Sequence, residues 1–263
     1  MQVDLNGRVA IVTGGAHGIG LAIAEHLCRN GASVAILDVD GNAARETARD
    51  LESDGYKVLA LAADVSNVEQ IGAAVAAVVE RFGRLDILIN NAGINSNNRH
   101  PIHEYREEDW HRILQVDLTG LFVTSRAVIP HLLKAEGGRI VNIASIAGIV
   151  PLRLQSGFVA AKAGVINLTR SMALELGPHG ILVNVVAPGS TLTRGTEALF
   201  YGPDGQFSEK ARSLLDHIPL GRPASTDEIA HAVLFLVAPE ASYINGAVLP
   251  VDGGWTAGYC RDW

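Results

Sequence analysis

Cysteine is almost absent from this sequence. Cys28 and Cys260 are the two present, far apart and without a Cys-x-x-Cys motif, so neither a disulfide framework nor a cysteine zinc site is expected. A reducing cytoplasm is the expected location. Long apolar runs are also lacking: stretches such as Val75 to Val79 and Ile140 to Ile143 fall well short of the roughly 20 residues that cross a bilayer. We expect no membrane span, and residues 1–6 lack the basic and apolar blocks of a secretion signal.

The sequence has no excess of positive charge. It contains 21 Lys and Arg against 28 Asp and Glu, a formal charge of −7, which argues against a nucleic-acid partner because such proteins carry a clustered basic face. No His, Asp and Glu cluster has metal-ligand spacing, so no metal is predicted. Hydrophobic residues make up 48% of the chain, which excludes an intrinsically disordered protein. Aromatics are scarce at 5%, whereas the 28 glycines suit many tight turns between strands and helices.

Short apolar runs alternate with longer amphipathic segments along the whole chain. This pattern predicts an α/β fold, a Rossmann-type doubly wound parallel sheet with helices on both faces. No linker or internal repeat divides the 263 residues, so we expect one domain over 1–263, with candidate substrate loops near 94–106 and 188–207 at the carboxyl ends of strands and a tail at 255–263. Helix starts are predicted at two capping boxes, Ser66 with Glu69 and Ser225 with Glu228. The seven expected strands are Arg8 to Thr13, Ser33 to Asp38, Lys57 to Ala62, Leu85 to Asn90, Arg139 to Ala144, Ile181 to Ala187 and Ala247 to Val251.

A glycine-rich turn follows the first expected strand. It reads Thr13-Gly14-Gly15-Ala16-His17-Gly18-Ile19-Gly20 and leads into a helical segment. Glycines let the backbone approach a pyrophosphate, and the helix N-terminus offers it free N–H groups, although an ordinary strand-to-helix turn is the alternative. Asp38 lies 18 residues past Gly20, close to the spacing at which an acid meets the adenosine ribose. A carboxylate there repels the extra phosphate of NADP, and Val39 brings no cation, so NAD is favoured unless Asp38 is merely a solvated turn residue.

At these residues the chain resembles the classical short-chain dehydrogenase/reductase family. The resemblance runs from Leu5 to about Trp255 and rests on four motifs, which are the TGxxxGxG turn, an Asp–Val pair, an NNAG turn and a PG turn. It implies NAD binding by residues of the glycine turn, of the Asp–Val pair and of the loops after later strands. The cofactor-binding candidates are Gly14, His17, Gly18, Ile19, Gly20, Asp38, Asp64, Val65, Asn91, Ala92, Gly93, Lys162, Pro188, Gly189, Thr191 and Thr193.

The chemical site departs from the family at its central residue. In the family a Tyr exchanges the hydroxyl proton, a Lys four residues later lowers its pKa and holds the nicotinamide ribose, and a Ser orients the substrate oxygen. Lys162 and Ser145 match these roles, but Phe158 occupies the Tyr position. Ser145 lies 13 residues upstream, the family's usual interval, and none of the five tyrosines lies four residues before a Lys, so no other register restores the motif. Phe158 has no ionisable oxygen, and the resemblance implies severely slowed hydride transfer.

A second departure is Asp117, at a position where the family usually has Asn. An ionised Asp cannot donate a hydrogen bond, and its charge would act on Lys162 if the two are close. Asp117 is either a tolerated variant or, through water, a replacement acid. Phe158 has three explanations: an engineered Tyr-to-Phe change that silences a complete enzyme, a natural member with weakened or altered chemistry, or a redox-silent NAD-binding protein that acts as a sensor or a structural subunit.

Substrate and assembly are weakly encoded. Arg153, between Ser145 and Phe158, and the cations of the loop after the NNAG turn suit a polyol, sugar or sugar acid, unless they are merely solvated. We expect residues 195–207 to form a lid that closes over bound cofactor. The alternative is that Phe200 and Tyr201 belong to a satellite core. Two of the three Trp residues lie past the last strand, and the family resemblance implies a homotetramer, with the tail reaching a neighbour or folding onto its own core. The loop cations are Arg99, His100 and His103.

Overall fold

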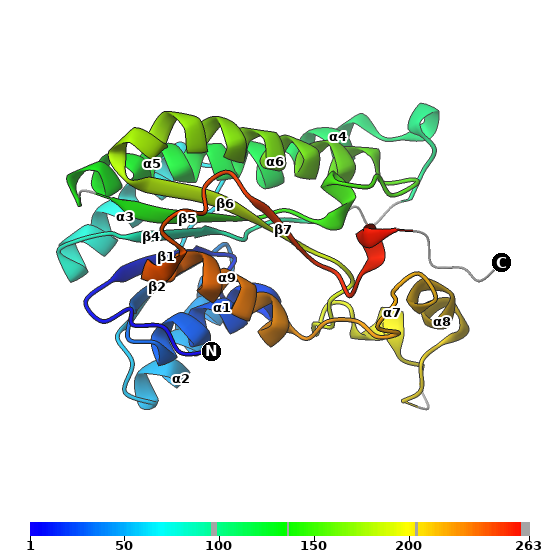
Figure 1. Cartoon of the computed structure of the whole chain (residues 1–263), viewed down its shortest axis with the longest axis horizontal. Coiled ribbons are helices and arrows are strands. Elements are labelled where there is room, and N and C mark those ends of the chain that lie inside the picture. The colour runs from blue at the N-terminus through cyan, green and yellow to red at the C-terminus, as the bar shows by residue number, and fades with distance from the viewer. Residues whose placement is uncertain (96–98, 136, 203–204, 259–263) are drawn as a thin grey trace.

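All seven expected strands pair in one parallel sheet, in the order β3-β2-β1-β4-β5-β6-β7 (Figure 1). A computed structural model describes residues 1–95, 99–135, 137–202 and 205–258. The strand ends differ from the predicted ends by two residues at most. The strands are β1 (Val9–Thr13), β2 (Ser33–Asp38), β3 (Val58–Ala62), β4 (Ile87–Asn90), β5 (Gly138–Ile143), β6 (Ile181–Pro188) and β7 (Val248–Val251).

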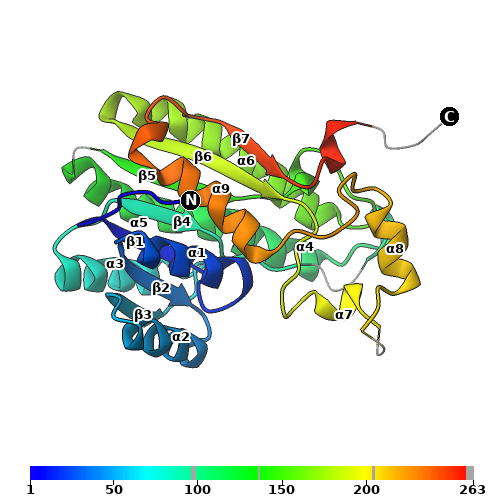
Figure 2. The same cartoon turned by 60° about the horizontal axis from the view of Figure 1, so that its bottom comes forward.

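Helices cover both faces of the sheet, as Figures 1 and 2 show from two directions. Helices α1, α2 and α9 pack on one face, while α3, α5 and α6 pack on the other. Successive side chains of a strand point to opposite faces, so Val12 belongs to the first core and Ile11 to the second. The described helices are α1 (Gly18–Arg29), α2 (Gly41–Ser53), α3 (Val68–Phe82), α4 (Glu107–Leu114), α5 (Gly120–Lys134), α6 (Ser156–Leu176), α7 (Glu197–Phe200), α8 (Glu209–Leu215) and α9 (Thr226–Val237).

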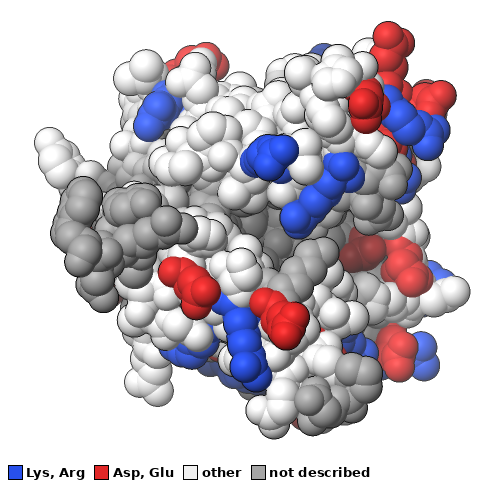
Figure 3. Space-filling view, turned by 90° about the vertical axis from the view of Figure 1, so that its right-hand side faces the viewer, with Lys and Arg blue, Asp and Glu red and all other residues white. Residues whose placement is uncertain are grey.

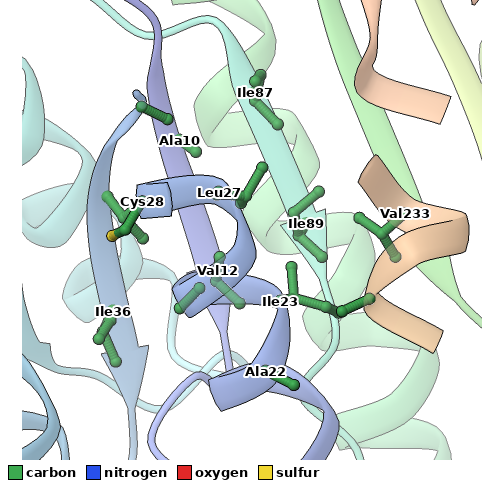
Figure 4. Close-up of a cluster of buried hydrophobic side chains, with 14 of the residues drawn as sticks. Ala10, Val12, Ala22, Ile23, Leu27, Cys28, Ile36, Ile87, Ile89 and Val233 are labelled. Atoms are coloured by element: carbon green, nitrogen blue, oxygen red, sulfur yellow. The ribbon is translucent and has the colours of Figure 1, made fainter. Parts of the chain in front are cut away.

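The first core fixes helix α1 and with it the turn that precedes the helix. Ile23 and Leu27 project from α1 toward the sheet, in the same core as Val233 of α9 (Figure 4). Both are 1% exposed. Cys28 lies in the same core, and burial raises the pKa of its thiol to about 12, so this thiol is unreactive at neutral pH. Cys260 lies outside the described residues.

One of the two predicted capping boxes is confirmed and the other is wrong. At α9, Ser225 Oγ accepts the Glu228 N–H and the Glu228 carboxylate accepts the Ser225 N–H. At α3 the cap is Asn67, whose side chain accepts the N–H groups of residues 69 and 70. The Ser66 hydroxyl and N–H instead both donate to the Asp64 carboxylate, two residues earlier, at 2.8 and 2.9 Å.

Helices α4 and α5 are joined by a π-helical segment, Gln115–Thr119, into one helix over Glu107–Lys134. By length and composition alone this joined helix could cross a membrane, although no uninterrupted apolar run of that length marks it in the sequence. In the fold, 44% of its most apolar window is buried, and it packs against α3 and α6. Its apolar character fits that of a helix in a protein core.

The chain reverses its direction of progress across the sheet between β1 and β4. From β1 it proceeds through β2 to β3, and from β4 it proceeds the other way to β7. In open α/β sheets, ligands bind in the crevice at the carboxyl ends of the strands beside such a switch point. The fold therefore places the ligand crevice between the residues that follow Thr13 and those that follow Asn90.

Candidate active site

The glycine turn has the geometry of a cradle for a phosphate group. Gly14 and Gly18 have φ of 60° and 55°, the left-handed region that favours glycine. A Cβ on Gly20 would lie 2.1 Å from the Gly14 carbonyl oxygen. Because this is far shorter than a van der Waals contact, only glycine fits at residue 20 in this turn. His17 is exposed and its side chain does not cap α1, so within the described chain the first N–H groups of this helix have no side-chain acceptor. Such groups can receive an anion.

Two carboxylates lie at the carboxyl end of β2. The Asp38 carboxylate accepts the Ala16 N–H at 3.1 Å and the Asp40 N–H at 3.0 Å, which fixes it beside the glycine turn. Asp40 caps α2, and the N–H groups of Ala43 and Asn42 lower the pKa of its carboxyl. The side chain of Val39 between them is exposed. This edge of the crevice is thus negative, with its charge held in place by the backbone.

The NNAG turn ties β4 to β1. Asn91 donates from Nδ2 to the carbonyl oxygens of Thr13 and Gly14, at 3.0 and 2.9 Å. Thr13 Oγ1 in turn accepts the N–H groups of Asn91 and Ala92. Thr13 therefore links the end of β1 to the NNAG turn by hydrogen bonds, a role that its place in the TGxxxGxG motif did not reveal. In the segment after β3, Asp64 accepts the Ser66 N–H and hydroxyl, and buried Val65 packs against Gly120.

Lys162 and Asp117 form a buried ion pair in the chemical site. The Lys162 Nζ lies 3.1 Å from Asp117 Oδ2, and their side chains are 6% and 0% exposed. Lys162 also donates to the Ile143 carbonyl at 3.3 Å, while Asp117 Oδ1 accepts the Ile94 N–H at 2.8 Å. Asp117 lies in the π-helical segment, an irregularity that frequently marks functional sites. The condition under which the Asp117 charge would act on Lys162, that the two are close, is thus met, whereas the two backbone partners carried no sequence signal.

Phe158 lies beside this pair. Lys162 Nζ is 5.5 Å from the centre of the Phe158 ring, an arrangement typical of a cation–π contact. Both side chains come from α6 with the i,i+4 spacing that puts them on one helix face. Ser145 directly follows the β5 region, and its Oγ accepts the Ala147 N–H at 3.1 Å. The site thus has a fixed cation and a hydroxyl, but no ionisable oxygen on residue 158.

The loop after β6 closes the crevice from the other side. Gly189 packs against Asp252, where a Cβ would lie 2.9 Å from the Asp252 Cα. Thr191 is buried and donates to the Gly189 carbonyl at 3.2 Å. Thr193 lies against the glycine turn, since its Cγ2 is 3.3 Å from where a Cβ of Gly18 would be. The fold thus brings Thr193, 175 residues away in sequence, to the N-terminus of α1.

The segments expected to contact substrate lie at the same end of the sheet, where Figure 3 shows a hollow bordered by basic side chains on one side and by acidic side chains on the opposite side. Arg153 is exposed, and its neighbour Leu154 has φ of 66°, a strained conformation for a branched side chain. In the loop after β4, Arg99 and His103 are exposed and His100 is half-buried, while residues 96–98 lie outside the described part.

For the segment 195–207, the alternative to a lid, that Phe200 and Tyr201 belong to a satellite core, is supported in part. Phe200 is 2% exposed and packs with Ala211, Leu215 and Ile218, so it belongs to a satellite core, against which Tyr201 packs. The segment borders a hollow of about 730 Å³. Trp255 also packs against this core, whereas residues 259–263 of the tail lie outside the described part. The lining residues of the hollow are Leu192, Arg194, Glu197, Ala198, Tyr201, Gly202 and Gly205.

Comparisons with known proteins agree with this fold. The profile of the family described as enoyl-(acyl carrier protein) reductase matches residues 14–256. The chain is 41% identical to a 3-oxoacyl-[acyl-carrier-protein] reductase of Vibrio cholerae, over 96% of this chain and 98% of that protein. It is also 41% identical to trans-4-hydroxycyclohexanecarboxylate dehydrogenase of Sinomonas cyclohexanicum, over 95% and 93%. The crystal structure of carveol dehydrogenase from Mycobacterium avium in complex with NAD superposes with a TM-score of 0.90 at 31% identity, covering 98% of this chain and 100% of that one.

The fold, the glycine turn and these similarities define a Rossmann-type oxidoreductase. The chain belongs to the classical short-chain dehydrogenase/reductase family.

Proposed function

We propose that this chain binds NAD and carries the site of an oxidoreductase that interconverts a secondary alcohol and a ketone, with Phe158 in the place of the proton-exchanging Tyr. The observation that carries the proposal is the position of the Lys162 Nζ, 5.5 Å from the Phe158 ring on the same face of α6. In this scaffold a phenol at residue 158 lies beside a cation that stabilises its ionised form. Phe158 fills that place and has no proton to exchange, so the present sequence is impaired as an enzyme.

The crevice residues fit a dinucleotide. The N-terminus of α1 and Gly14, Gly18 and Gly20 receive the pyrophosphate, and the Asp38 carboxylate accepts hydrogen bonds from the adenosine ribose. Asp64, Val65 and the Asn91–Gly93 turn line the adenosine side. Pro188, Gly189, Thr191 and Thr193 border the nicotinamide, and Lys162 holds its ribose. When bound, NAD supplies the acceptor or donor of a hydride.

The substrate is a small hydroxylated molecule, such as a polyol, sugar or sugar acid. Ser145 orients its oxygen and Arg153 contacts its polar groups. The similarity to a hydroxycyclohexanecarboxylate dehydrogenase supports a substrate that carries both a hydroxyl and a carboxylate. The second candidate function is a redox-silent NAD-binding protein, a sensor or structural subunit in the cytoplasm. It is favoured by one observation, which is that Asp117 already neutralises the buried Lys162.

Cofactor choice tests the binding part of the proposal. In calorimetric titration we expect NAD to bind at least about tenfold more tightly than NADP, because the Asp38 carboxylate repels the extra phosphate of NADP. A repulsion of about 1.4 kcal/mol is enough for a tenfold difference in affinity. The double substitution D38S/V39R removes this repulsion and adds a cation, so it should reverse the preference. The control D54N removes an exposed acid at the far end of α2 and should leave the ratio unchanged. Equal affinities in the parent chain would contradict the assignment of Asp38.

We also propose a homotetramer. Large apolar side chains are exposed on two groups of elements, Phe122 and Leu174 on α5 and α6, and Phe235 and Tyr243 on α9 and the segment before β7. Exposed apolar patches of this kind mark subunit contacts. Sedimentation equilibrium should give the mass of four chains, and F122E/L174E should reduce it to two. The control V68E, at the exposed first residue of α3, should leave the mass unchanged. A monomeric parent chain would refute the assembly.

A further inference from the structure

We propose that Asp117 is a positioning residue that gives Lys162 a fixed counter-charge, and that it thereby determines the pH at which a phenol introduced at residue 158 ionises. This inference rests on the proposed function and extends it. It treats the two departures from the family pattern, Phe158 and Asp117, as one electrostatic unit. Asp117 acts through Lys162 and exchanges no proton with substrate.

The geometry of the carboxylate supports a fixed position. Its Oδ1 accepts the Ile94 N–H at 2.8 Å, which leaves Oδ2 directed at the Lys162 Nζ at 3.1 Å. The side chain of Asp117 is completely buried, so solvent does not screen the pair as it would on the surface. Buried ions need both an opposite charge and hydrogen bonds. Asp117 has the Lys162 ammonium beside Oδ2 and one hydrogen bond at Oδ1, while Oδ2 makes no hydrogen bond within the described structure.

The position of Lys162 is equally constrained. Its Nζ donates to the Ile143 carbonyl at 3.3 Å. Gly93 packs over the pair, because a Cβ there would lie 3.0 Å from Asp117 Oδ2 and 3.2 Å from Lys162 Nζ. The loop after β4, strand β5 and the π-helical segment thus hold the ammonium from three directions. It does not need residue 158 as an anionic partner.

The neighbouring elements bring two further hydroxyls to this region. Ser145 follows β5, and its Oγ accepts the Ala147 N–H. The Tyr105 hydroxyl comes from the segment before α4 and lies 3.0 Å from where a Cβ of Gly157 would be. These two groups are hydroxyls, and the charged side chains in these contacts are those of Lys162 and Asp117.

The two charges have opposite effects on a phenol at residue 158. An ammonium alone at such a distance stabilises phenolate and moves its titration down by about one to three pH units. The Asp117 carboxylate bound to that ammonium opposes the effect. We therefore expect the phenol of F158Y to titrate within about one pH unit of free tyrosine. Replacement of Asp117 by its neutral isostere should restore the downward shift.

The test is an ultraviolet difference titration of F158Y against the parent chain, in which the five existing tyrosines cancel. A phenol midpoint within about one pH unit of free tyrosine is expected, and a midpoint two or more units below it overturns the proposal. This measurement needs one conservative substitution that leaves the ion pair intact. It therefore gives a result even if variants of Asp117 do not fold.

The second measurement compares F158Y with F158Y/D117N, after circular dichroism and NAD titration have shown that both are folded. The alkaline midpoint of kcat for alcohol oxidation should fall by about one to three pH units in the double variant. F158Y/D117S is a second version that removes the charge and leaves space for water. Unchanged midpoints in folded double variants overturn the inference while the proposed function stands. If F158Y binds NAD but oxidises no alcohol, the proposed function fails, and the difference titration still decides the inference.

The parent chain and D117N provide the remaining comparison, which concerns proton exchange by Asp117 itself. A residual rate in the parent chain that follows the titration of a carboxylate, and that disappears in D117N, would overturn the positioning role in favour of a replacement acid. A flat pH–rate profile between about pH 5 and 9 in both chains is expected instead, because no group that contacts substrate then titrates in that range.

Discussion

F158Y should oxidise a secondary alcohol with NAD about 10²- to 10⁴-fold faster than the parent chain, the usual contribution of a positioned general acid/base. The new phenol extends from a ring that already lies 5.5 Å from the Lys162 Nζ, so little rearrangement is needed. The measurement is NADH absorbance with a panel of polyols, sugar acids and hydroxycarboxylates. If the inference about Asp117 holds, the gain should be largest at alkaline pH, because the phenol must ionise beside a neutralised cation.

Two controls separate a restored site from a general effect of the added hydroxyl. F122Y adds the same group to a half-exposed Phe on α5 and should remain as slow as the parent chain. F158Y/S145A keeps the new phenol and removes the hydroxyl that orients the substrate, so most of the gain should be lost. If F158Y binds NAD and stays inactive with every alcohol in the panel, the redox-silent interpretation is preferred.

G20A should weaken NAD binding by about 10- to 100-fold. A Cβ at this position would lie 2.1 Å from the Gly14 carbonyl and 2.5 Å from Asn91 Nδ2, so the turn must shift away from its observed geometry. Strain of this kind typically costs about 1–3 kcal/mol, and 1.4 kcal/mol is a factor of ten in affinity. Calorimetric titration with NAD measures the change.

The matched control for G20A is G72A. Gly72 lies in α3, and a Cβ there would have no atom within 4 Å. The substitution should leave NAD affinity unchanged and raise the free energy of unfolding by about 0.5–1 kcal/mol, because alanine favours a helix over glycine. Normal NAD affinity in G20A would show that the tight packing of the turn is not needed for the cofactor.

The sequence located the strands well, because each is a short apolar run; the inner strands are largely buried, whereas the edge strands β3 and β7 are mostly half-buried. It located helix starts less well. Ser66 and Glu69 have the spacing of a capping box, yet Asn67 caps α3, because side chains within three residues compete for the same N–H groups and only their actual geometry decides between them. The joined helix over Glu107–Lys134 was missed for a related reason, since its charged residues interrupt the apolar run while the packed face remains continuous.

By itself the sequence determined the family, the glycine cradle, the acid after β2 and the replacement of the family's Tyr by Phe158, because these depend on residue type and on spacing along one strand or helix. Only the tertiary structure decided which side chains of the site contact one another. Asp117 and Lys162 are 45 residues apart in sequence, and their 3.1 Å contact, closed over by Gly93, arises where three separate segments meet. Residue type gives the charge of each group, whereas the effect of that charge on Phe158 depends on distance and burial, which only the folded chain sets.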